Sequence, residues 1–470
     1  MSPDEFRRHA HELVDWMADY LADASPHRVV PDVVPGQIAG ALPGRAPEAA
    51  EPFEAIFADF ERLIVPGMTH WNHPGWFAYF PGNNSPPSIL AEMLTATLGA
   101  QCMSWQTSPA ATELEQVTME WLRDMLGLPA DFTGVIQDTA STSTLVALIS
   151  ARERATGNAW GSKGPEPGGP PLVVYASAEA HSSVAKGVRL AGYGSAMLRA
   201  IPVDDAFALL PDALEAAIQA DIAAGIRPAC VVATIGTTSS TAVDPVRAVG
   251  EICRRHGAWL HVDAAYAGSA AILPECRRHF DGVELADSFV FNPHKWLLTN
   301  FDCSAYFVRD VDGLLRRFGA APEYLRTAHD ERVVNYRDWG IQLGRRFRAL
   351  KLWFVIRSYG VEGLRRVLRA HIAMAQELRS WIEAEPGFEV MAPSPFGLVC
   401  FRHCPARLKA AVDLDEHNRT LLARVNSSGS AFLTHTSLNG AFAIRAVVGQ
   451  WRTGYRDIER LWRLIREASG

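Results

Sequence analysis

A lysine and an aspartate stand at the ends of two short strand-like runs in the middle of the chain. Lys295 comes four residues after the apolar run 288–291, and Asp263 ends the run 259–263. The chain has only five lysines, so arginine supplies nearly all of its other positive charge. A deprotonated lysine amine can condense with a carbonyl group, which an arginine cannot do. Lys295 is therefore a candidate nucleophile, although most lysines simply lie on the surface.

Polar side chains follow several such runs. The short β-forming runs 172–175, 229–234, 259–263 and 288–291 alternate with helical patterns. Continuous apolar strands separated by helices predict a parallel sheet covered on both faces. Functional groups in such sheets gather where the strands end. The residues at or just after these ends are His181, Thr238, Asp263 and Lys295.

A hydroxyl-rich turn offers a place for an anion. The strand-like run 134–137 leads into the turn 138–144 and then a helical pattern at 145–154. Free amides and hydroxyls at a helix N-terminus can bind a phosphate, although such runs also act merely as caps. Together with a lysine, a carboxylate and a flat histidine, this turn suits pyridoxal phosphate. That cofactor needs an amine for its aldehyde, a carboxylate for its ring nitrogen and a helix N-terminus for its phosphate.

The two ends of the chain differ from this middle part. Ser2, Pro3 and Glu5 predict a capped helix start, and an amphipathic helix follows. We expect a helical dimerisation segment at 1–84, a large cofactor-binding α/β domain at 85–352 and a small α+β domain at 353–470. The helices of 1–84 have apolar faces but too little mass for their own core, so we expect them to pack on another domain or subunit.

The composition is that of an ordinary globular protein, with 48% hydrophobic residues and a net charge of −7 over 470 residues. The absence of basic clusters argues against nucleic acid or an anionic membrane as a partner. Seven cysteines without a CxxC pair predict thiols in a reducing cytoplasm. Charges from Asp4 onward argue against a signal peptide, and no apolar run approaches membrane length. His70 and His73 lack further ligands at metal-binding spacing, so we expect no metal.

Five motifs make the chain resemble the group II pyridoxal-phosphate decarboxylases, specifically those of the aromatic-L-amino-acid (dopa/tryptophan) type, over essentially its whole length. They are AHSS at 180–183, ATIGTT at 233–238, HVDAAYAG at 261–268, NPHKW at 292–296 and LGRRF at 343–347. The resemblance implies a fold type I, aspartate-aminotransferase-like enzyme with a mostly parallel central sheet. It also implies a homodimer with active sites at the interface.

The resemblance implies roles for individual residues. Lys295 would bind the cofactor aldehyde, Asp263 would pair with the ring nitrogen, and Tyr324 would protonate the α-carbon after carbon dioxide leaves. His181 would stack on the ring and help to place the substrate carboxylate. The implied cofactor residues are Thr139, Ala140, Ser141, His181, Thr238, Asp263, Ala265, Asn292, His294 and Lys295. The implied substrate residues are Trp71, Tyr79, Phe80, Pro81, Gly82, Gln101, Met103, His181 and Gly344.

Several departures from the family pattern leave the substrate open. Gln101 and Met103 stand where animal members carry larger apolar side chains, Gly82 replaces a hydroxyl residue, and Asp138 stands where glycine is common. Gly344 implies room for an indole or catechol and argues against histidine. The expected substrate is thus L-dopa, 5-hydroxytryptophan, tryptophan or a close relative.

Three other functions remain as alternatives. An aromatic aldehyde synthase is disfavoured because both His181 and Tyr324 are present. A glutamate-type decarboxylase is disfavoured by the aromatic stretch 71–80. A non-catalytic cofactor-binding regulator is disfavoured because Lys295 is intact and the chain has no helix-turn-helix extension or basic face.

Overall fold

The computed structural model describes residues 1–319, 322–325, 327–330, 332–408 and 410–470. The chain divides into two compact units. The large unit contains residues 82–376 and 390–400, and the small unit contains residues 1–81, 377–389 and 401–470. The candidate cofactor residues all belong to the large unit, so its sheet and helices position the site.

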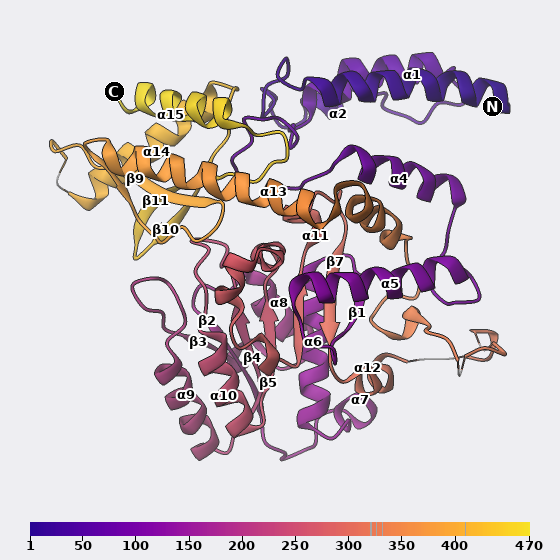
Figure 1. The fold of residues 1–470 in the computed structure, drawn as a ribbon, viewed down its shortest axis with the longest axis vertical. Helices are drawn as coiled ribbons and strands as arrows, with labels where there is room; N and C mark the ends of the chain where they lie inside the picture. The colour runs from indigo at the N-terminus through magenta and orange to yellow at the C-terminus, as the bar shows by residue number, and fades with distance from the viewer. Residues whose placement is uncertain (320–321, 326, 331, 409) are drawn as a thin grey trace. The chain divides into compact units, whose positions relative to one another are not determined.

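The large unit is built on a seven-stranded sheet (Figure 1). In spatial order its strands are β1 (Thr133–Gln137), β7 (Ser304–Val308), β6 (Ser288–Phe291), β5 (Trp259–Asp263), β4 (Arg227–Thr234), β2 (Leu172–Ser177) and β3 (Leu198–Ile201). β7 runs antiparallel to both β1 and β6, and the remaining pairs are parallel. The prediction of a mostly parallel sheet is confirmed, while β3 and β7 lie outside the predicted runs.

Helices cover this sheet because its strands are apolar on both faces. Every residue of β2, β5, β6 and β7 is buried. α6 (Ala140–Ala155) packs across β4 to β7 and against α8 (Ser182–Leu190) and α12 (Val311–Phe318). α9 (Pro211–Ala223) and α10 (Val246–His256) pack together and on β4. Shorter or peripheral helices of this unit are α4 (Pro86–Leu98), α5 (Pro109–Leu126), α7 (Trp160–Lys163) and α11 (Pro293–Trp296).

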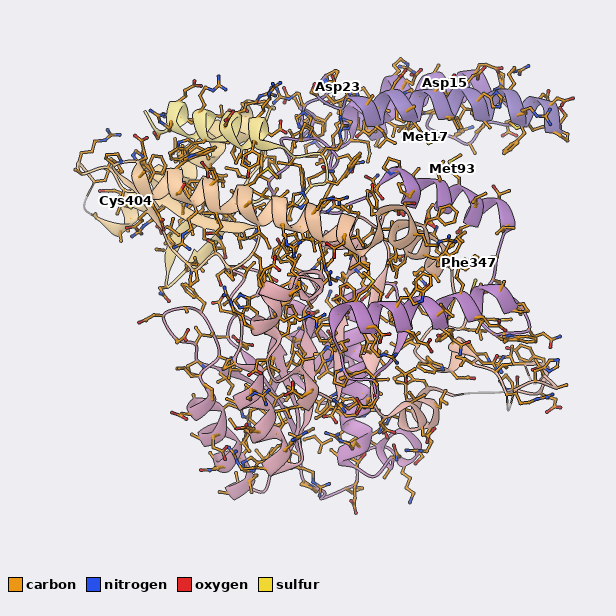
Figure 2. All side chains as sticks on the ribbon, in the orientation of Figure 1. Asp15, Met17, Asp23, Met93, Phe347 and Cys404 are labelled. Carbon is orange, nitrogen blue, oxygen red and sulfur yellow. The ribbon has the colours of Figure 1, made fainter. Side chains whose placement is uncertain are left out.

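The long helix α13 (Arg348–Ala384) begins later than the sequence pattern indicates. Its pattern starts at residue 343, but residues 343–347 form no helix. Phe347, labelled in Figure 2, is nevertheless buried, so an apolar spacing persists through a segment without helical backbone. Gly360 interrupts α13 with φ 62° and ψ 167°, a left-handed φ that glycine adopts without steric cost. Residues 361–384 form the part of α13 beyond this break.

The small unit begins with α1 (Pro3–Ala22), in which Ser2 and Glu5 form the predicted capping box. Its other helices are α2 (Gln37–Ala41), α3 (Phe53–Asp59), α14 (Ala411–Ser427) and α15 (Tyr455–Ser469). A second sheet has the order β10 (Thr434–Leu438), β11 (Ala441–Val447), β9 (Leu398–His403) and β8 (Phe388–Val390). Among the helices described, none is both long and apolar enough to cross a bilayer.

Candidate active site

The carboxyl ends of five strands lie at one edge of the large sheet. β2, β4, β5 and β6 are mutually parallel, and β1 shares their direction because both β1 and β6 run antiparallel to β7. Five predicted residues lie at these ends or within four residues after them, namely Thr139, His181, Thr238, Asp263 and Lys295. The topology thus brings residues from distant parts of the chain to one edge.

Lys295 and Asp263 provide an amine and a carboxylate at adjacent strand ends. Lys295 lies in α11, directly after β6, and Asp263 is the last residue of β5. Burial lowers the pKa of the Lys295 ammonium, and the charge of Asp263 acts in the opposite direction. Asp263 is 5% exposed, and its Oδ1 accepts the backbone N–H of Ala265 at 3.0 Å. A lowered pKa increases the fraction of neutral amine, which is the nucleophilic form.

His181 lies within electrostatic reach of both groups. It caps the N-terminus of α8, where its Nδ1 accepts the backbone N–H of Ser183 at 3.2 Å. Partial burial lowers the pKa of His181, the carboxylate of Asp263 raises it, and the ammonium of Lys295 lowers it further. This hydrogen bond to Nδ1 restrains the orientation of the imidazole ring. A flat cofactor ring could stack on the face of the imidazole.

A series of backbone hydrogen bonds connects the ends of β5 and β6. The N–H of Asn292 donates to the carbonyl of Ala265 at 3.0 Å, and the N–H of Lys295 donates to the carbonyl of Asn292 at 2.9 Å. The side-chain amide of Asn83 donates to the carbonyl of Lys295 at 2.8 Å. Asn83 is fully buried and lies outside the predicted set. Its only sequence signal is an Asn-Asn pair just after the aromatic stretch.

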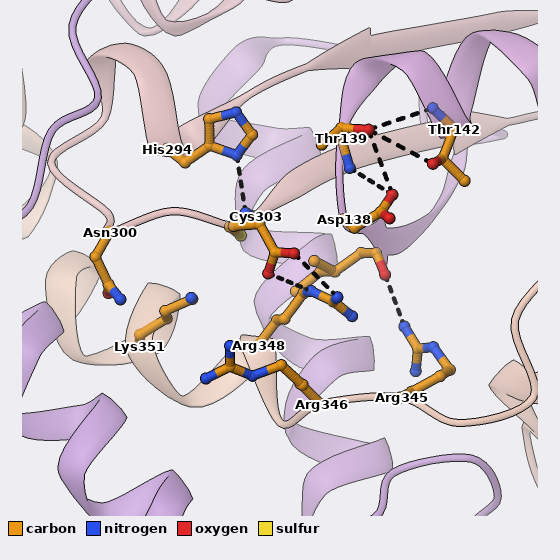
Figure 3. Close-up of polar contacts among 12 residues, drawn as sticks. Asp138, Thr139, Thr142, His294, Asn300, Cys303, Arg345, Arg346, Arg348 and Lys351 are labelled. Carbon is orange, nitrogen blue, oxygen red and sulfur yellow. Dashed lines mark hydrogen bonds and ion pairs between the residues drawn. The ribbon is translucent and has the colours of Figure 1, made fainter. Parts of the chain in front are cut away.

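The start of α6 presents the predicted anion cradle (Figure 3). Thr139 is the N-cap, and its hydroxyl accepts the N–H of Thr142 at 3.4 Å. Asp138 Oδ1 accepts the N–H of Thr139 at 2.6 Å. The N–H groups of Ala140 and Ser141 fall in the first helical turn, where a helix offers them no acceptor. They can therefore donate to a phosphate.

His294 lies in α11 immediately before Lys295, and its side chain is buried. Its Nδ1 accepts the N–H of Cys303 at 2.9 Å (Figure 3), and its ring packs on Phe301 with centroids 4.7 Å apart. Burial and the charge of Lys295 lower its pKa to about 3. The imidazole is therefore neutral at pH 7 and carries its proton on Nε2.

These residues fit pyridoxal phosphate. The side-chain oxygen of Asn292 is buried without a hydrogen-bond partner among the residues that the structure describes. Buried polar atoms in native proteins nearly always have a partner, so this amide has capacity for a bound group. The nearby lysine, the buried carboxylate and the amides of residues 140–141 match the aldehyde, ring nitrogen and phosphate of that cofactor.

The predicted substrate residues are divided between the two units. In the small unit, Trp71 and Tyr79 stack with centroids 5.9 Å apart and are 39% and 52% exposed. Phe80 and Pro81 are buried next to them in the chain. The large unit contains Gly82, Gln101, Met103 and Gly344.

Gln101 and Gly344 lie next to each other in the large unit. Gln101 Oε1 accepts the N–H of Arg345 at 2.8 Å. A Cβ atom on Gly344 would lie 3.2 Å from Gln101 Nε2. The carbonyl of Met103 accepts the N–H of Arg337 at 2.8 Å, which joins the same two segments. The three predicted residues Gln101, Met103 and Gly344 are thus brought together.

A buried ion pair holds the Gly344 segment against the start of the sheet. Arg345 donates to Glu115 at 2.6 Å and to the carbonyl of Ile136 at 2.8 Å. Glu115 also accepts the N–H of Ile136 at 2.9 Å. Gln342 donates to Asp138 Oδ2 at 2.9 Å, so the segment also contacts the turn before α6.

Tyr324 stands apart from the other predicted catalytic residues. It lies in the short 3-10 helix Glu323–Leu325, and its side chain is 77% exposed. Within the described ranges, its hydroxyl has no hydrogen bond and its ring has no aromatic contact. In the described part of the chain, no group of three or more His, Cys, Asp and Glu side chains is arranged to bind a metal ion. Among the residues that the structure describes, no hydrogen bond or aromatic contact joins Tyr324 to the residues around Lys295.

The mostly parallel sheet with a lysine and a buried carboxylate at its carboxyl edge defines a pyridoxal-phosphate enzyme of fold type I. Residues 35–404 match the family described as the pyridoxal-dependent decarboxylase conserved domain, and the chain belongs to this family. It is 45% identical to aromatic-L-amino-acid decarboxylase of Bos taurus, covering 99% of this chain and 96% of that one. It is 43% identical to phenylacetaldehyde synthase of Arabidopsis thaliana, with coverage of 99% and 96%.

Solved structures give the same result. The crystal structure of Oryza sativa TDC with PLP and tryptamine superposes with a TM-score of 0.97 at 40% identity, covering 100% of this chain and 98% of that chain. The protein is therefore a pyridoxal-phosphate-dependent carboxy-lyase with the fold of this family.

Proposed function

We propose that the protein decarboxylates an aromatic L-amino acid, such as L-dopa, 5-hydroxytryptophan, tryptophan or a close relative, to the amine and carbon dioxide. The observation that carries the proposal is the Lys295 amine with a lowered pKa near the buried carboxylate of Asp263. The aromatic substrate is supported by the names of the relatives and by the tryptamine in the Oryza sativa structure.

Each residue has a defined task in this proposal. When bound, pyridoxal phosphate supplies an aldehyde for amines and a ring that accepts the electron pair left by carbon dioxide. Lys295 would hold the aldehyde, and Asp263 would keep a proton on the ring nitrogen. The backbone N–H groups of residues 140–141 and the side-chain N–H of Asn292 would hold the phosphate, while Thr238, Ala265 and His294 would complete the surroundings. His181 would stack on the ring and orient the substrate carboxylate.

Tyr324 is proposed to protonate the α-carbon in the partner subunit's active site. We infer a cytoplasmic homodimer in which residues 1–84 contact the partner, the domain 85–352 binds the cofactor and 353–470 forms the small domain. The Tyr324 side chain is 77% exposed and has no hydrogen bond or aromatic contact with the described residues, which supports this arrangement. So do the exposed Trp71 and Tyr79, because large aromatic side chains gain from burial at an interface.

Hybrid dimers test the shared site. Lys295→Ala and Tyr324→Phe variants should each make little amine alone. After dissociation and reassociation together, a mixed dimer would contain one site with both residues intact, so amine production should return. No recovery in verified mixed dimers, or full activity of a monomer, would contradict the shared site.

An aromatic aldehyde synthase is the second candidate, favoured by the 43% identity to the Arabidopsis thaliana phenylacetaldehyde synthase. That reaction combines decarboxylation with oxidative deamination, so its products include aldehyde and hydrogen peroxide. His181 and Tyr324 are both present, which favours the decarboxylase.

The deciding experiment supplies pyridoxal phosphate and a panel of L-dopa, 5-hydroxytryptophan, tryptophan, tyrosine, phenylalanine, histidine and glutamate. Amine, aldehyde and peroxide are quantified together, with Lys295→Ala as the control. Amine from one or two aromatic substrates is expected. Aldehyde with peroxide would select the synthase, and amine from glutamate alone would refute the aromatic assignment.

A further inference from the structure

His261 is a buried histidine to which the proposed mechanism assigns no role. It lies on β5 two residues before Asp263 and is 0% exposed. Side chains two residues apart on a strand point to the same face, so His261 and Asp263 share a face of the sheet. The charge of Asp263 acts on the imidazole, which shows that the two groups lie within electrostatic reach.

The contact of His261 with Ser288 is compatible with a proton on Nε2. His261 Nδ1 lies 2.9 Å from the hydroxyl oxygen of Ser288, its direct partner on β6. That oxygen accepts the indole N–H of Trp259 at 2.9 Å, and the single hydroxyl hydrogen can be donated to Nδ1. With Nδ1 as acceptor, the neutral imidazole carries its hydrogen on Nε2.

The Nε2 atom of His261 is buried and has no hydrogen-bond partner in the described part of the chain. Asp263 accepts one backbone N–H, from Ala265, and a carboxylate can accept about four hydrogen bonds. Thr234 is the cross-strand neighbour of Asp263 on β4, and its buried hydroxyl also has no partner among those residues. The buried Nε2 atom and a carboxylate that can accept further hydrogen bonds therefore share one buried face of the sheet, where unmade hydrogen bonds are costly.

We propose that His261 is a positioning residue for Asp263. Its Nε2–H supports the carboxylate, directly or through an ordered water that Thr234 also binds, and so holds Asp263 in line with the cofactor ring nitrogen. The inference rests on the proposed role of Asp263 and extends it to a residue that does not touch the cofactor. The consequence is that His261 influences cofactor affinity and the electronic state of the bound ring.

Two substitutions separate this role from a purely structural one. His261→Gln places its terminal amide near the position of Nε2, whereas His261→Asn places an amide near the position of Nδ1. If Nε2–H supports Asp263, the Gln variant should bind pyridoxal phosphate within about threefold of wild type. The Asn variant should bind about tenfold more weakly and show a changed absorbance of the bound cofactor, as expected for the loss of one hydrogen bond to a charged group.

Equal affinity and spectra for the Gln and Asn variants, or tighter cofactor binding by the Asn variant than by the Gln variant, would overturn the proposal. The contact with Ser288 would then be the only role of the His261 side chain that the structure supports. Asp263→Asn distinguishes this failure from failure of the proposed site. If Asp263→Asn kept wild-type affinity and absorbance, the role of Asp263 itself would be wrong.

A crystal structure of the wild-type holoenzyme tests the proposal even if the His261 variants do not fold. Nε2 within hydrogen-bonding distance of Asp263, or of a water shared with it, is expected. Nε2 bound to any other group would refute the proposal.

Discussion

Replacing Glu115 with glutamine should destabilise the protein far more than the same change at an exposed ion pair. The side chains of Glu115 and Arg345 are 3% and 6% exposed, with N and O atoms 2.6 Å apart. Glutamine keeps an oxygen that can accept the N–H of Ile136, so the main loss is the negative charge. The guanidinium of Arg345 then remains buried without its counterion.

The burial of this pair sets the expected magnitude. Leaving one partner of a buried pair uncompensated costs about 3–5 kcal/mol, whereas exposed pairs contribute about 0–1 kcal/mol. A loss of about 4 kcal/mol reduces the folding equilibrium constant by about a thousandfold. Arg369 and Glu275 provide the control, because their atoms are also 2.6 Å apart but their side chains are 45% and 51% exposed.

Urea unfolding of wild type, Glu115→Gln and Glu275→Gln measures both effects. We expect the free energy of unfolding to fall by about 3–5 kcal/mol for Glu115→Gln and by about 1 kcal/mol or less for Glu275→Gln. Equal losses in the two single variants would refute the reasoning that burial sets the cost.

Three further predictions concern catalysis, specificity and pH. Tyr324→Phe removes the phenolic proton, so amine production should fall while aldehyde and peroxide rise; unchanged amine output would remove Tyr324 from the mechanism. Gln101→Leu removes a donor beside Gly344, so the ratio of kcat/KM for L-dopa to that for phenylalanine should fall about tenfold, and an unchanged ratio would exclude Gln101 from ring recognition. Burial lowers the pKa of His294 from 6.5 to about 3, so its stabilising contribution is complete above pH 6.5 and is lost by about 1.4 kcal/mol per pH unit as the pH falls toward 3. Unfolding of His294→Gln should show a shallower pH dependence over that range, and an identical dependence would contradict the assignment.

Local patterns predicted much of the large unit. The runs 259–263 and 288–291 coincide with β5 and β6, because buried parallel strands are short and continuously apolar. The start of α13 cannot be located from the pattern alone, since helical spacing of apolar residues begins at 343, five residues before the helical backbone. The direction of β7 depends on its pairing with β1 and β6, which no local pattern encodes.

The sequence by itself determined the chemical groups: one lysine after a strand, one aspartate at a strand end, and a helix start suited to phosphate. Tertiary structure decided their properties. The lowered pKa of Lys295 comes from burial, and its nearness to Asp263 comes from strand pairing. Likewise, Asn83 meets the carbonyl of Lys295 only through the fold, across 212 positions of chain. Burial and strand register are collective properties of distant segments, so a residue's type can be read locally, whereas its pKa and partners cannot.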